Sequence, residues 1–131
     1  MTAPTLPQLL EQYTAAPPAD PWAATSPADD VFNQLAPDLP ALYWQVHISP
    51  RGLPTEIRGQ VEPGTDDSDA AAILTVWAAR LSLPHTDRSL PGMCEHFDLR
   101  DDCYLVVWAV IDRERWAADT LRRTQPEGWP A

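Results

Sequence analysis

The chain has 131 residues, a length typical of one domain with its own hydrophobic core. Its formal net charge of −10 argues against nucleic-acid binding, because neutralising phosphates requires clustered basic side chains. The start of the chain lacks the basic and apolar segments of a secretory signal, and the longest apolar run, residues 104–111, is too short to cross a bilayer. We therefore expect a cytoplasmic protein with no membrane partner and with reduced cysteines.

The first forty residues differ from the rest, because they are rich in proline and alanine and carry acids but no lysine or arginine. Two short helices are predicted there. Thr5 and Gln8 have the spacing of a capping box, and Ser26 followed by Pro27 is a typical helix start. The sequence is therefore divided into an acidic N-terminal segment (1–40), a core domain (41–125) and a tail (126–131).

From residue 43 the apolar residues alternate with polar ones, which indicates β-strands. Residues 43–49 and 55–62 are predicted to form a hairpin, with the segment between them as its turn. A register that places Ile48 opposite Ile57 and Val46 opposite Gly59 keeps every apolar side chain on one face. The same register places His47 opposite Arg58 on the polar face.

A helix is predicted over residues 65–81, because acids crowd its first turn, Arg80 lies in its last turn and Pro84 follows it. Strands at 94–99 and 103–111 and a final helix at 113–123, capped by Asp112, complete the domain. The apolar stripe of the first helix is Ala70, Ile73, Leu74, Trp77 and Leu81, and that of the second is Trp116, Ala117, Thr120 and Leu121.

The element order ββαββα predicts the α+β class, with an antiparallel four-stranded sheet and helices packed on it. This order is similar to that of acidic secretion-chaperone domains, which surround a small sheet with helices and often dimerise. The resemblance rests on element order without any shared motif, so it is an analogy at the level of the fold.

The segment 91–103 is the part of the chain that most resembles a site of chemistry, since it contains Cys94, His96 and Cys103. With His85 these residues could bind zinc, but they lack the paired spacing of zinc ligands. A disulfide is also disfavoured, because a turn near Asp101 places the two cysteines far apart along the hairpin. We therefore predict a hairpin with an acidic tip, no metal, no cofactor and no catalytic residue.

The strand at 103–111 is apolar on both sides, whereas a sheet with helices on one face should be polar on the other. Tyr104, Val106, Trp108 and Val110 form its second side. Two covers are possible. One is the N-terminal segment, through Trp22, Phe32, Leu35 and Leu39. The other is a partner, either another protein or a second copy of the chain.

These observations predict a small acidic, non-enzymatic protein-interaction module that acts as an adaptor, a chaperone-like protein or an inhibitor. Its binding residues would be Tyr104, Val106, Trp108 and Val110, with the two aromatic residues as anchors. One alternative is a phage or plasmid inhibitor whose carboxylates mimic nucleic acid. Another is a small enzyme or metal-binding protein that uses Cys94, His96 and Cys103.

Overall fold

The computed structural model describes residues 4–15, 26–52, 54–100 and 102–124. Its elements are α1 (Leu6–Ala15), α2 (Pro27–Phe32), a 3₁₀ turn (Asn33–Leu35), β1 (Tyr43–Ile48), β2 (Pro54–Gln60), α3 (Asp67–Leu81), β3 (Met93–Arg100), β4 (Cys103–Val110) and α4 (Arg113–Thr124). The predicted α+β class, the four strands and the order ββαββα are confirmed. Within these ranges no helix has both the length and the apolar character needed to cross a membrane.

The predicted helix starts are also confirmed. The Thr5 amide donates to Gln8 Oε1 at 2.8 Å, and the Gln8 amide donates back to Thr5 Oγ1 at 3.4 Å. Ser26 Oγ accepts from the Asp29 amide at the start of α2, and Asp112 Oδ1 accepts from the Arg115 amide at the start of α4. Each bond satisfies a backbone N–H that has no partner within its own helix.

The sheet is mixed, so the prediction of an entirely antiparallel sheet is wrong. Its strand order is β1-β2-β4-β3, and β2 runs parallel to β4, from Glu56 opposite Tyr104 to Gln60 opposite Trp108. The connection through α3 brings the chain back to the start of β3 at the edge, and the hairpin then places β4 beside β2. The most apolar strand thus occupies an interior position, where both of its faces can be buried.

The first hairpin has a different register from the predicted one. Trp44 lies opposite Gly59 and Val46 opposite Ile57, two residues from the predicted pairing, with an irregularity near Ile48. A β-carbon on Gly59 would lie 2.9 Å from Leu42 Cδ1 and 2.9 Å from the Trp44 ring. The side chains keep their predicted faces because the shift is by two, and the glycine provides the space that the indole needs.

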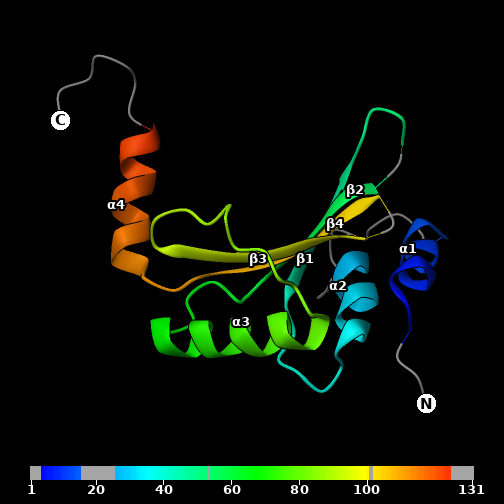
Figure 1. Ribbon diagram of the computed structural model, residues 1–131, viewed down its shortest axis with the longest axis horizontal. Helices are drawn as coiled ribbons and strands as arrows, with labels where there is room; N and C mark the ends of the chain where they lie inside the picture. Colours follow the sequence, from blue (N-terminus) through cyan, green and yellow to red (C-terminus); the bar gives the residue numbers. More distant parts are fainter. Residues whose placement is uncertain (1–3, 16–25, 53, 101, 125–131) are drawn as a thin grey trace.

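The helices α2 and α3 pack against one face of the sheet, which we call the helix-covered face, and α1 packs against α2 and joins the same core, while α4 lies beyond one end of the strands (Figure 1). Phe32, Trp44 and Trp77 form a line of rings through this core, with centroids 5.8 Å apart at each step. The Trp77 indole donates to the Pro40 carbonyl at 2.8 Å, which ties α3 to the segment before β1.

The N-terminal segment therefore packs on the helix-covered face and does not cover the opposite one. Phe32 is fully buried in the core, where its ring lies next to those of Tyr13 and Trp44, and Leu35 and Leu39 pack against the same cluster. Trp22, the fourth residue predicted for that cover, lies outside the described residues, as does the tail at 126–131. The prediction fails for Phe32, Leu35 and Leu39 because α2 is held at the edge of β1, where Asp29 accepts from the Trp44 amide.

The apolar stripe of α3 is confirmed, since Ala70, Leu74, Trp77 and Leu81 are buried and Ile73 is partly buried. The stripe predicted for α4 is wrong in part. Ala117 and Leu121 are exposed, and Trp116 is half-buried. Because α4 extends past the sheet (Figure 1), it contacts the strands mainly through its first turns.

Candidate functional site

The face of the sheet opposite the three helices, which we call the second face, carries side chains from all four strands. The strand registers place them in rows across the sheet. They are His47, Glu56, Tyr104 and Leu99 in the first row, Gln45, Arg58, Val106 and Phe97 in the second, and Tyr43, Gln60, Trp108 and Glu95 in the third.

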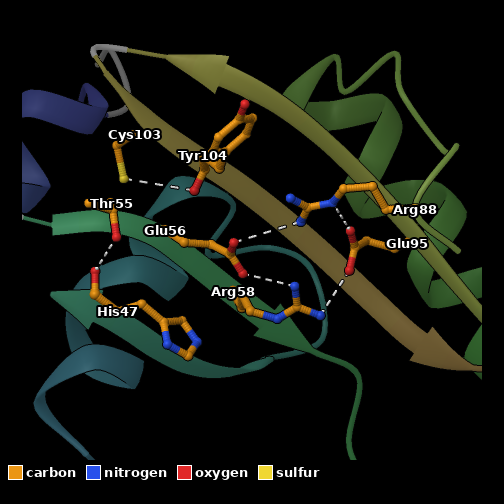
Figure 2. A network of polar contacts seen from close by, with 8 residues as sticks. All are labelled: His47, Thr55, Glu56, Arg58, Arg88, Glu95, Cys103 and Tyr104. Atoms are coloured by element: carbon orange, nitrogen blue, oxygen red, sulfur yellow. Dashed lines mark hydrogen bonds and ion pairs between the residues drawn. The ribbon is translucent and has the colours of Figure 1, made fainter. Parts of the chain in front are cut away.

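Two arginines and two glutamates form a closed ring of ion pairs on this face, which we call the ion-pair ring (Figure 2). Arg58 lies 2.8 Å from Glu56 and 2.9 Å from Glu95. Arg88 lies 2.7 Å from Glu95 and 3.8 Å from Glu56. Three of the four residues come from strands, whereas Arg88 belongs to the segment that connects α3 to β3.

The ring is possible because each buried charge has opposite charges beside it. Glu95 is 3% exposed, and a buried carboxylate is tolerated when it is paired and hydrogen-bonded. The connecting segment is held near Glu95 by a second contact, since the Glu95 amide donates to Ser89 Oγ at 2.9 Å. The beginning of this segment is also attached to β3, because the backbones of His85 and Phe97 exchange two hydrogen bonds.

The ion-pair ring is associated with three aromatic side chains. The Arg88 guanidinium lies 4.4 Å from the centroid of Phe97 and 5.5 Å from that of Tyr104. The Arg58 guanidinium lies 5.6 Å from the centroid of Trp108. Cations over ring faces are attracted electrostatically, and planar guanidiniums also stack well on aromatic rings. Each arginine is therefore held by a carboxylate at its edge and by a ring beneath it.

This arrangement explains why β4 is apolar on both faces. Val106 lies between Arg58 and Phe97 in its row and is fully buried. The stems and planar heads of long charged side chains can exclude water from apolar surface while their charges stay paired. The chain thus covers the middle of the second face with its own charged residues and with Trp116, whose ring centroid lies 6.3 Å from that of Trp108.

The four residues predicted to bind a partner differ in accessibility. Tyr104 is 38% exposed, Trp108 and Val110 are half-buried, and Val106 is inaccessible. Leu99, opposite Tyr104, is 54% exposed and was not predicted. Val110 also lines a pocket of about 320 Å³ between α4 and the end of β2.

The charged members of the face were missed by reasoning from sequence. Glu56, Arg58 and Glu95 follow the alternation of their strands, which gives their face but not their partners. Arg88 lies in an irregular segment, where no periodicity predicts its direction.

The structure separates the cysteines of segment 91–103. Cys94 lies opposite Ala109 and Cys103 opposite Arg100, so the set Cys94, His96 and Cys103 is not assembled, and neither cysteine forms a disulfide. Cys94 Sγ lies 3.6 Å from His96 Nε2 on the helix-covered face, and burial lowers the pKa of His96. Across the described part of the chain, no group of three or more His, Cys, Asp or Glu side chains is arranged to hold a metal ion.

The chemistry that this geometry supports best is the binding of cationic groups between carboxylates and aromatic rings. Comparison with protein-family models, with curated proteins and with solved structures finds no match for this chain. The second face is therefore interpreted from its own contacts, burial and charge.

Proposed function

We propose that this chain is a non-enzymatic protein-interaction module that binds another protein through the second face of its sheet. The observation that supports the proposal is the asymmetry of the sheet. Three helices lie on one side of the sheet, whereas in the described ranges the other face meets a helix at α4, through Trp116. Tyr43, Leu99 and Tyr104 are exposed on this second face. Exposed aromatic and aliphatic residues around a partly buried centre are typical of binding surfaces.

The charge of the molecule favours a basic partner over a second copy. A chain with a net charge of −10 attracts basic surfaces and accelerates their approach, whereas two such chains repel each other. The module would act as an adaptor, a chaperone-like protein or an inhibitor in the cytoplasm, where Cys94 and Cys103 remain thiols.

Mimicry of nucleic acid is the weaker alternative, because it requires carboxylates that are free and aligned. Several acids instead face arginines of the same chain. Asp66 and Asp67 lie 3.7 and 3.4 Å from Arg113, and Asp38 lies 2.7 Å from Arg80. Internal pairing of this kind reduces the negative potential that a mimic would present.

The proposal is tested with two matched surface variants. Leu99→Asp places a carboxylate on the second face, and Val76→Asp places one on the solvent side of α3, where the original side chain is similarly exposed (46%, against 54% for Leu99). Tagged wild-type protein and both variants are used as baits at low and high salt, with mass spectrometry of the bound proteins. Circular dichroism checks that both variants fold.

The wild type and Val76→Asp should capture the same protein, and Leu99→Asp should capture at least about tenfold less of it, as for the loss of an interface anchor. Equal capture by all three baits would contradict the proposal. Light scattering identifies a different occupant: a dimer that Leu99→Asp dissociates would show that a second copy, not a foreign protein, covers this face.

A further inference from the structure

We propose that the second face is a recognition site for an arginine side chain of a basic peptide segment, and that Arg88 occupies this site in cis. The inference rests on the proposed function and names the chemistry of the partner. The ligand class is inferred from the chain itself, because one of its own arginines is bound in this way. The Arg88 guanidinium lies between the Glu95 carboxylate and the rings of Phe97 and Tyr104.

The walls of this site suit a guanidinium better than an ammonium group. Glu95 Oε1 accepts from Arg88 Nε at 2.7 Å in the plane of the guanidinium. Phe97, whose ring centroid lies 4.4 Å from the Arg88 carbon, supports the flat face of the group. A lysine ammonium is a strongly hydrated point charge that cannot form the planar fork or stack in this way.

Arg88 is the member of the ion-pair ring that another arginine can replace. Arg58 belongs to β2 and is held at 2.8 and 2.9 Å by both glutamates. Arg88 comes from an irregular segment, its side chain is 36% exposed, and its distance to Glu56 is 3.8 Å, so its second ion pair is loose. An incoming arginine that reached Glu56 more closely would complete the ring better than Arg88 does.

Exposed side chains beside the site would contact the other residues of a bound peptide. Leu99 and Tyr104 lie side by side in the first row of the second face, and both are exposed. The net charge of −10 adds a long-range attraction for basic segments. Arg88 competes with any such ligand at an effective concentration of roughly millimolar, as for a group on a short tether. Removing Arg88 should therefore increase the affinity for an arginine peptide about 10- to 100-fold.

The test uses the full chain and the variant Arg88→Ala. The probes are an acetylated, amidated peptide of alternating glycine and arginine, the same peptide with lysine, and guanidinium chloride at low millimolar concentration. Arg100→Ala is the matched control. Its side chain has a similar exposure (32%) and an ion pair with Asp98 at 3.2 Å. Within the described part of the chain, its guanidinium lies over no aromatic ring. Calorimetry measures peptide binding, and thermal unfolding measures the effect of guanidinium.

We expect Arg88→Ala to bind the arginine peptide at least about tenfold more tightly than the wild type, and the lysine peptide at least about tenfold more weakly than the arginine peptide. Guanidinium should raise the Tm of Arg88→Ala but not that of Arg100→Ala. If Arg88→Ala does not fold, Arg88→Lys replaces it, since it keeps the stem and charge but lacks the fork.

The inference is overturned if the folded Arg88 variant binds the arginine peptide no better than the wild type does, or binds both peptides equally. That result does not contradict the proposed function if the capture of a partner protein is still reduced by Leu99→Asp. Conversely, tight and selective peptide binding by Arg88→Ala supports the site, even if the Leu99→Asp bait captures the same proteins as the wild type and the broader proposal fails.

Discussion

The substitution Glu95→Gln removes one charge from the ion-pair ring and keeps the shape of the side chain. Glu95 lies 2.7 Å from Arg88 Nε and 2.9 Å from Arg58 Nη2. With charge centres about 4 Å apart and an effective dielectric constant of about 20, each attraction amounts to about 4 kcal/mol. The variant loses both attractions but also avoids the penalty of several kcal/mol for burying a carboxylate. We expect a net loss of about 2–4 kcal/mol in the free energy of unfolding.

Urea denaturation is the suitable assay, because urea is uncharged and does not screen ion pairs. With a slope of about 2 kcal/mol per molar, the middle of the usual range for small domains, the midpoint should fall by about 1–2 M at an unchanged slope. Asp98→Asn is the control, since Asp98 is on the same strand, is partly exposed and pairs with Arg100 at 3.2 Å. Exposed pairs of this kind contribute less than about 1 kcal/mol.

Equal losses in Glu95→Gln and Asp98→Asn would refute the reasoning. They would mean that water screens the ion-pair ring and that Val106 is kept dry by something other than its charged cover. A change in the slope of the urea transition would also count against it, because it would indicate a change in the compactness of the native or denatured state, or a loss of two-state unfolding, rather than a lost ion pair.

Two further predictions concern the register of the first hairpin and the pairing of α3. Gly59→Ala should destabilise the protein by about 1–3 kcal/mol in urea, because its β-carbon overlaps Trp44 and Leu42, and a neutral effect would mean that this close approach is absent in solution. The fork from Arg80 lowers the pKa of Asp38 from its ordinary 3.8 to about 2. The pair therefore stabilises the fold fully above pH 3.8, and its contribution is lost as pH falls through about 2. An NMR titration of the Asp38 carboxyl should show this midpoint, and Arg80→Gln should raise it toward the ordinary value, because the largest cause of the low pKa is then removed. A midpoint of 3.8 in the wild type would show that the fork does not form.

Local features of the sequence were sufficient to predict the elements, the faces of the strands and the apolar face of α3. The capping residues Thr5 and Ser26 fixed helix starts, and the stripe of α3 followed from its helical spacing. The alternation in β4 identified both of its apolar sides and required that each be covered. These features depend on residues within a few positions of one another, so a single stretch of chain contains all the information that they need.

The tertiary structure alone decided the strand pairing and the cover of the second face. The parallel pairing of β2 with β4 joins segments separated by the whole of α3 and β3. The ion-pair ring likewise requires Glu56, Arg58, Arg88 and Glu95 to converge from two strands and an irregular segment. Which charged residue meets which depends on the path of the connecting segment, and that path is set by packing against the finished sheet rather than by local sequence preference.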